Sequence, residues 1–222
     1  MVSLSRLVKP TSIPYSNVWV RSVYNLGSVR HFGDPVINNY SVAYGRKEHQ
    51  WNTLTDADIA EMSKLWEPLS YLLEYERTYR RVVRALKNFE LAHGIYFANF
   101  RFPIIHAALE SMICTTWKHN KAQVTQRLPQ IVSFISRQQA EDIYLLCCDL
   151  KHAAQAMLQN SIEAGPISPG DQKRIDSVGL LHEAVRCLLL RSLRERAFAD
   201  TLVDINKLKT TYKAFDPKGN LI

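Results

Sequence analysis

Hydrophobic residues in the segment 69–93 recur at alternating steps of three and four. The repeated positions are Tyr75, Tyr79, Val82, Leu86, Phe89 and His93. Because an α-helix has about 3.6 residues per turn, this spacing places them on one face of a helix. Gly94 follows the last of them and is typical of the residue that ends a helix. The pattern therefore predicts a long amphipathic helix that ends near residue 93.

A helix start signal lies before this segment. Thr55 is followed three residues later by Asp58, which resembles a capping box with Asp in place of the usual Glu. An apolar run follows and is interrupted by Pro68. Proline removes a backbone donor and clashes with the preceding turn, so we expect this helix to end or kink at residue 68.

Further periodic segments predict helices over the rest of the chain. One begins near Asn99, with Pro103 in its first turn; others span about 129–137, 139–160, 172–197 and 199–213. The polar stretch 118–126 and the turn-rich stretch 163–171 are expected to be loops. About seven helices with short connections predict a mainly α fold, a helical bundle.

The first 53 residues have a different composition from the rest. Prolines and glycines are frequent there, and β-favouring stretches occur at 18–24 and 40–44. We expect residues 1–53 to form an extended arm or a small sheet. The predicted organisation is this arm followed by the helical bundle over 54–222.

The composition fits a chain that folds around its own core. Of 222 residues, 46% are hydrophobic and 22% are charged, so no disulfide or metal is needed for folding. The four cysteines lack the CxxC spacing of a zinc site and are expected to be reduced thiols. Neither a secretory signal nor an apolar run of about 18 residues is found, which predicts a cytoplasmic protein outside the membrane.

The segment 85–113 resembles the core of HEPN domains, specifically the Apea-like branch. In that branch an apolar helix precedes an Arg-led helix that ends in Ala-Leu-Glu, matched here by Arg101 and 108–110. The segments 149–156 and 180–202 follow in the same order as in that family. The resemblance implies a helical bundle that forms a homodimer, associates with RNA without a cofactor, and serves in bacterial or phage-related defence.

The resemblance also implies a metal-independent ribonuclease motif, an arginine followed by a histidine after four to six residues. Asp149 stands here at the position of that arginine, and Ala154 at that of the histidine. His152 is present but displaced by two residues. A carboxylate in place of the phosphate-binding cation predicts that the usual cleavage site is inactive.

Other side chains offer alternative catalytic groups. Arg101 and His106 satisfy the motif spacing, but five positions turn about 140° along a regular helix, so they would face different ways. His106 and Glu110 are four residues apart and share one helix face. They could form an acid–base site together with His152, or a buried polar network that fixes the register of the helices.

The formal net charge of +7 permits binding to a polyanion. The candidate phosphate contacts are a stripe of Arg77, Arg81 and Arg84 and a basic cluster containing Lys118 and Lys121. A third cluster lies in the tail, at Lys207, Lys209, Lys213 and Lys218. Trp117 and Tyr212 adjoin the last two clusters, as suits stacking on single-stranded RNA, although solvated helix faces and core packing account for the same residues.

Three hypotheses follow from these patterns. The first is a HEPN-like protein that binds RNA and has lost cleavage. The second is an active metal-independent ribonuclease with a rearranged centre containing His106, His152 and an arginine. The third is a non-catalytic helical module that dimerises or holds a partner protein.

Overall fold

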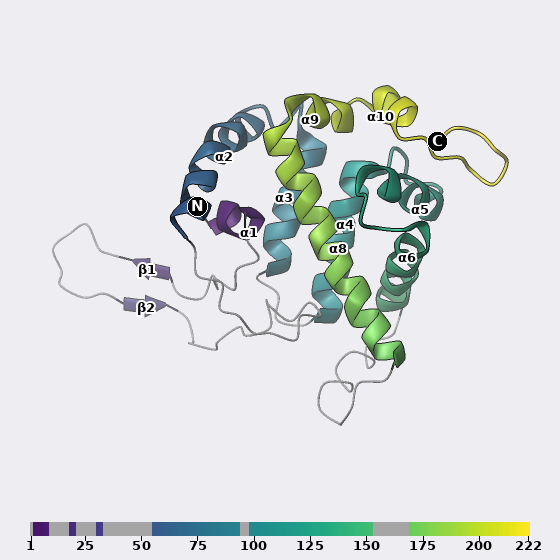
Figure 1. Cartoon of the computed structure of the whole chain (residues 1–222), viewed down its shortest axis with the longest axis horizontal. Coiled ribbons are helices and arrows are strands. Elements are labelled where there is room, and N and C mark those ends of the chain that lie inside the picture. The colour runs from purple at the N-terminus through teal and green to yellow at the C-terminus, as the bar shows by residue number, and fades with distance from the viewer. Residues whose placement is uncertain (1, 9–17, 21–29, 33–54, 94–97, 153–168) are drawn as a thin grey trace.

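The computed structural model describes residues 2–8, 18–20, 30–32, 55–93, 98–152 and 169–222 (Figure 1). The described elements are α1 (Val2–Val8), β1 (Val18–Val20), β2 (Arg30–Phe32), α2 (Asp56–Glu74), α3 (Arg80–His93), α4 (Ala98–Ile113), α5 (Asn120–Ile131), α6 (Arg137–His152), α8 (Pro169–Arg194), α9 (Arg196–Val203) and α10 (Ile205–Thr211). The prediction of a mainly α helical bundle is confirmed. No helix in the described ranges is long and apolar enough to cross a membrane.

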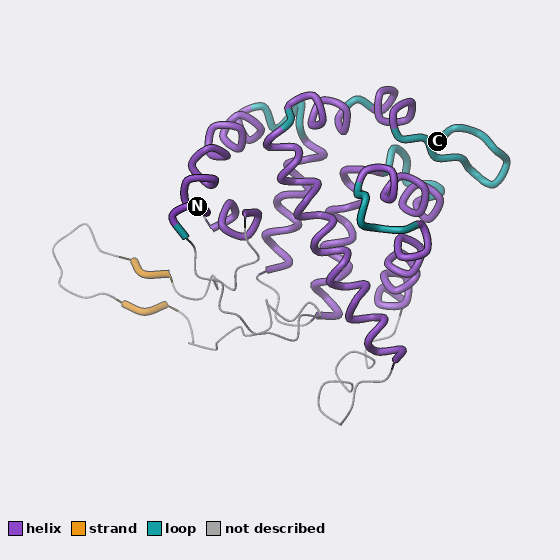
Figure 2. Tube along the Cα trace, in the orientation of Figure 1, coloured by secondary structure: helices purple, strands orange, loops and turns teal. Residues whose placement is uncertain are grey.

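The centre of the bundle consists of α3, α4 and α8. Helices α3 and α4 pack most closely, and α8 crosses both of them (Figure 2). Helices α5 and α6 pack on one side of this centre, whereas α1 and α2 pack against α8 on the other. Phe89, Phe102 and Leu109 are fully buried between these helices, so α3 and α4 contribute the large side chains of the core.

Helix α2 begins as the sequence predicts. The Thr55 amide donates to Asp58 Oδ2 at 2.8 Å, and the Asp58 amide donates to Thr55 Oγ1 at 3.2 Å, which completes the capping box. The expected end at Pro68 was wrong, because α2 continues to Glu74. Buried leucines on both sides of Pro68 hold the two halves in one helix despite the lost hydrogen bond.

The break between α2 and α3 lies at residues 75–79. Tyr75 caps the end of α2 and its side chain is exposed, so it does not join the apolar stripe. The other members of the predicted stripe, from Tyr79 to His93, are all buried. The periodicity thus identified the buried face of α3 and misplaced its first residue.

The predicted loop at 118–126 and helix at 129–137 were wrong. A single helix, α5, spans Asn120–Ile131, and Pro129 lies within its last turn. Gln123, Thr125 and Arg127 are buried there beside Val124 and Leu128. These polar side chains face inward and are hydrogen-bonded. Because polar residues are usually exposed, the sequence pattern predicted a loop where the structure has a helix.

The N-terminal part combines a helix and a small antiparallel pair of strands. β1 falls in the predicted β stretch 18–24 and pairs with β2, whereas 40–44 lies outside the described residues. Helix α1 was not predicted. Leu4 and Leu7 of α1 are fully buried in the core, so α1 is part of the bundle and not of an extended arm.

The later boundaries differ from the prediction by smaller amounts. Helix α4 begins one residue before Asn99, and α8 matches the predicted 172–197 closely. The predicted single helix 199–213 is divided in two at Asp204, whose carboxylate accepts from the amides of Asn206 and Lys207. Of the predicted loop at 163–171, residues 163–168 lie outside the described residues, whereas 169–171 are not a loop but the first residues of α8.

Candidate nucleic-acid interface

The carboxyl end of α4 is held by Arg81 from α3. Its Nε donates to the Ser111 carbonyl at 2.9 Å, and its Nη2 donates to the carbonyls of Met112 at 3.0 Å and Cys114 at 2.5 Å. Burial lowers the pKa of Arg81 to about 10. The predicted phosphate-binding stripe is corrected here, because the Arg81 guanidinium caps a helix instead of facing solvent.

Arg127 from α5 is the second cap on this helix end. The fully buried guanidinium donates to the Ile113 carbonyl, the Tyr212 carbonyl and Gln123 Oε1, each at 2.8 Å, and also to the Ile222 carbonyl. Burial lowers its pKa. Arg127 therefore ties α4, α5 and the C-terminal tail together at one point.

The loop that follows α4 is fixed by Gln123. Its Oε1 accepts from the Thr115 amide at 2.6 Å, and its Nε2 donates to the Lys118 carbonyl at 2.8 Å. His119 then adopts a left-handed backbone, with φ of 60°. Trp117 is left 82% exposed, with Lys118 Nζ 5.1 Å from its ring centre. The loop thus presents an indole and a cation to solvent on a hydrogen-bonded frame.

The C-terminal tail packs beside this loop, on α5. Gln126 donates to the Phe215 carbonyl and accepts from its amide, both at 2.9 Å, and Gln130 donates to the Lys213 carbonyl at 2.8 Å. Hydrogen bonds from Asn220 lower the pKa of Asp216 in the tail's turn. Lys213 and Lys218 stay exposed, so the tail carries its cations on the surface.

The start of α3, the loop after α4 and the C-terminal tail lie toward the end of the bundle where α10 lies (Figure 1). Their exposed residues are together called the terminal basic surface: Arg77, Arg80, Arg84, Trp117, Lys118, Lys213 and Lys218. Lys121 lies nearby on α5 but forms a 2.7 Å ion pair with Glu141 on α6. The structure therefore brings the three predicted basic clusters to one end, without Arg81 and with Lys121 already paired.

The predicted catalytic residues Arg101 and His106 lie on α4 and are both buried, 4% and 1% exposed. Arg101 acts electrostatically on His93 of α3 and His182 of α8. The His106 ring instead packs against Tyr144 of α6, with ring centres 5.7 Å apart. The two side chains have different neighbours, as the helix geometry predicts, and neither is accessible to an RNA chain.

His106 and Glu110 are neighbours, although no hydrogen bond joins them. His106 Nδ1 is 3.7 Å from Glu110 Oε1, and that oxygen accepts from Asn120 Nδ2 at 3.0 Å. Neither ring nitrogen of His106 has a hydrogen-bond partner among the described residues. Burial of this kind fits a residue of the packed interior better than a general base, which must reach its substrate.

Asp149 and His152, which the sequence suggests as neighbours of His106, are both on α6. Asp149 is exposed on α6, whereas His106 is buried. His152 is the last residue of α6, and its side chain lies outside the described part of the structure. Among the described residues, no three His, Cys, Asp or Glu side chains are placed to hold a metal ion.

The sequence analysis did not identify His93 and His182 as a buried pair. His93 Nδ1 lies 2.7 Å from the Phe89 carbonyl, and His93 Nε2 lies 3.2 Å from His182 Nε2. Burial lowers the pKa of His93 to about 4 and also lowers that of His182. The signal was present, because His182 is four residues after Val178 and three before Val185 on the apolar face of its helix.

No family model, no curated protein and no solved structure matches this chain.

Proposed function

We propose that this protein binds single-stranded RNA through the terminal basic surface and does not cut it. The observation that carries this proposal is the meeting of three basic segments, far apart in the sequence, at the carboxyl end of α4. Arg81 and Arg127 place these segments by binding carbonyl groups of α4, the following loop and the tail. The cations of the surface are exposed and can contact phosphate.

The surface combines the two features that single-stranded nucleic acid requires. Exposed lysines and arginines attract the phosphate backbone, and their contacts weaken as salt rises. Trp117 is 82% exposed and offers an aromatic face beside Lys118, and Phe215, between Lys213 and Lys218 in the tail, is 43% exposed. Bases of any identity stack on such faces, because every base has a π surface. A surface of this kind predicts affinity for single strands with little sequence preference.

Binding without cleavage is supported by the state of the motif residues. A metal-independent ribonuclease needs an accessible base, an acid and a cation around the scissile phosphate. Arg101 and His106 are buried, and Asp149 occupies the place where the related motif has arginine. The alternative of an active ribonuclease predicts RNA fragments without metal, and these fragments disappear in the variant His106→Ala.

The proposal is tested with a fluorescent oligouridine of about 12 nucleotides, within the usual site size for such surfaces. Trp117→Ala is expected to weaken binding by about 5- to 100-fold, the range for losing one stacked base. Lys118→Glu/Lys218→Glu is expected to weaken it by more than about 10-fold and to reduce the salt slope by roughly 0.7 per lost contact. Fluorescence anisotropy over a salt series measures both effects, and a gel shows intact RNA.

The matched control is Lys64→Glu/Arg194→Glu, which makes the same change in net charge. Lys64 and Arg194 are exposed on α2 and α8, and both are paired with Glu61. This control is expected to bind RNA nearly as the native protein does. Undetectable binding at low salt, or equal losses in the control and in Lys118→Glu/Lys218→Glu, contradicts the proposal.

A second candidate function is supported by the exposed side of α2. Ile59, Trp66 and Leu73 are 47%, 53% and 44% exposed and repeat every seven residues. Side chains spaced in this way lie along one seam, as in helices that pair with another helix. The spacing is symmetric about Trp66, so an antiparallel pair of α2 helices from two copies places Trp66 at the two-fold axis. We infer a homodimer through this seam.

Trp66→Glu is expected to convert such a dimer to a monomer, because it places two carboxylates at the centre of the seam. Light scattering coupled to size exclusion measures the mass of both proteins. Leu145→Glu, at a 44% exposed position of α6, is the control and should remain dimeric. If the native protein has a monomeric mass at about 100 µM, the inferred dimer through this seam is contradicted.

A further inference from the structure

We propose that the His93–His182 pair is an acid-sensitive latch that holds α1 in its groove, and that protonation of this pair releases α1 while the rest of the bundle stays folded. This inference is independent of RNA binding. It concerns the buried polar layer where α1, α3, α4 and α8 meet.

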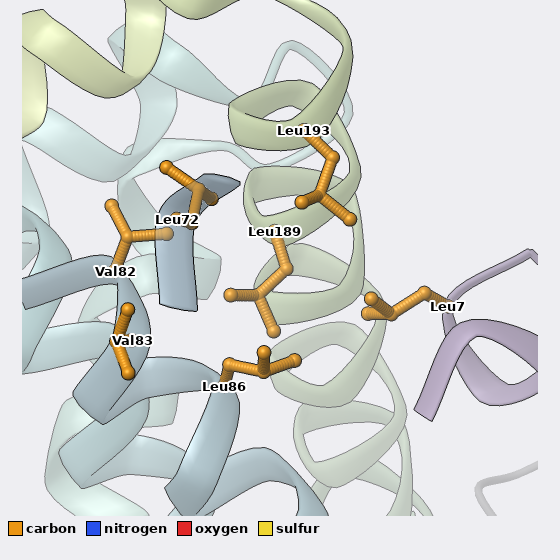
Figure 3. A pocket seen from close by; sticks show the side chains of 7 residues that line it. All are labelled: Leu7, Leu72, Val82, Val83, Leu86, Leu189 and Leu193. Carbon is orange, nitrogen blue, oxygen red and sulfur yellow. The ribbon is translucent and has the colours of Figure 1, made fainter. Parts of the chain in front are cut away.

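Helix α1 is stable only when it is packed against the rest of the bundle. It has 7 residues, and isolated helices of that length are unstable in water. Leu4 and Leu7 are fully buried. Leu7 extends from α1 toward α8 in a small apolar gap (Figure 3), whose other lining residues are Leu72, Val82, Val83, Leu86, Leu189 and Leu193. The apolar part of the contact therefore includes Leu4 and Leu7 of α1.

Two arginines make polar contacts between α1 and the helices beneath it. Arg6 of α1 donates to Glu90 Oε2 of α3 at 2.9 Å. Arg186 of α8 donates to the carbonyls of Leu7 at 2.6 Å and Val8 at 3.4 Å, which caps the end of α1. Glu183 accepts from Arg186 at 2.8 Å and orients it. When α1 is packed in place, the buried layer therefore contains the guanidinium of Arg6 as well as that of Arg186.

The two histidines belong to the same layer. His93 is three residues from Glu90 on α3, and His182 is four residues from Arg186 on α8, so each shares a helix face with its neighbour. His93 Nδ1 at 2.7 Å from the Phe89 carbonyl must carry a proton, which leaves its Nε2 as an acceptor. His182 Nε2 then donates to it. Both rings are neutral in this arrangement.

The charges around the pair oppose its protonation. Within the described part of the chain, Arg6 from α1, Arg101 from α4 and Arg186 from α8 act on the pair electrostatically and lower the pKa of its rings. The carboxylates of the layer, Glu90 on α3 and Glu183 on α8, are already bonded to Arg6 and Arg186. Removal of α1 takes Arg6 away and admits water, so the released form accepts protons more readily than the docked form.

The sign of the effect follows from this difference. Burial lowers the pKa of His93 to about 4 from its ordinary 6.5. The stability of the docked form relative to the released form is therefore greatest above pH 6.5, and it decreases as the pH falls from 6.5 toward 4. If release restores the ordinary pKa, His93 alone weakens docking by roughly 20-fold between pH 7 and pH 5.

Hydrogen exchange of the full chain tests the latch. After correction for intrinsic exchange rates, the protection of the α1 amides is expected to fall by roughly 20-fold from pH 7 to pH 5. Amides of α4 at 108–113 should keep their protection. In His93→Gln/His182→Gln, which retains polar groups that do not titrate, α1 should be equally protected at both pH values. His106→Gln, a buried histidine of α4 packed against α6, is the control and should retain the loss.

If the double variant does not fold, measurements on the native protein alone still test the proposal. Two of the seven histidines should titrate in its NMR spectrum together with the loss of α1 signals. Unchanged protection of α1 at pH 5 overturns the proposal. Equal loss of protection in α1 and α4 also overturns it, because the whole bundle then opens at once. A loss that persists in His93→Gln/His182→Gln assigns the effect to other groups and overturns it as well.

Discussion

Replacing Arg127 with methionine is expected to lower the free energy of unfolding by about 3–5 kcal/mol. Methionine fills much of the same volume but donates no hydrogen bond. The carbonyls of Ile113, Tyr212 and Ile222 then lose their shared donor in a fully buried position. Each buried group left without a partner costs about 1–3 kcal/mol, which makes this one of the larger single effects in the chain.

Urea unfolding followed by circular dichroism measures this loss. Arg194→Met is the matched control, because Arg194 is half exposed and pairs with Glu61 on the surface. Exposed ion pairs contribute about 0–1 kcal/mol, so the control should unfold at nearly the native midpoint. A loss in Arg127→Met no larger than in the control shows that water replaces the guanidinium, and that the α4 cap does not stabilise the fold.

The role of Arg81 and Arg127 explains why the sequence could predict the bundle but not the site. Spacing places a residue on a helix face, and the apolar stripe from Tyr79 to His93 was found in this way. Spacing does not show which groups of the neighbouring helix that residue contacts. Both arginines meet carbonyl groups at the end of α4, and their bonds to Ser111 and Ile113 span 30 and 14 residues of sequence.

Polar residues in the interior account for the main errors in the elements. Gln123 was assigned to a predicted loop because polar side chains are mostly exposed. In the structure Gln123 is fully buried and makes several hydrogen bonds, one of them to the buried Arg127. The sequence likewise did not indicate that His93 and His182 are in contact. Their 3.2 Å contact depends on how α8 crosses α3, which no local pattern records.

The clustering of basic segments was only partly predictable. The sequence showed three groups of cations, and it associated two of them with Trp117 and Tyr212. Their meeting at one end of the bundle depends on the antiparallel packing of α3 and α4 and on the path of the tail over α5. Gln126 and Gln130 fix that path through bonds to the tail, across 89 and 83 residues of sequence.

Replacing Phe89 with alanine is expected to lower the free energy of unfolding by about 3–5 kcal/mol. Phe89 is fully buried at the centre of α3, with ring centres 4.6 Å from His93 and 5.0 Å from His182. Its removal leaves a cavity beside the two histidines, and the surrounding helices α3, α4 and α8 can fill such a space only in part. The cavity and the lost apolar contacts both contribute to the effect.

The control for this change is Leu91→Ala on the same helix. Leu91 is 56% exposed and lies off the apolar stripe, so its loss should change the free energy of unfolding by less than about 1 kcal/mol. Both variants introduce alanine into α3, which keeps the difference in helix propensity small. Thermal and urea unfolding compare the two proteins. Equal losses contradict the packing of α3, because the face predicted by its periodicity is then not the face that carries the core.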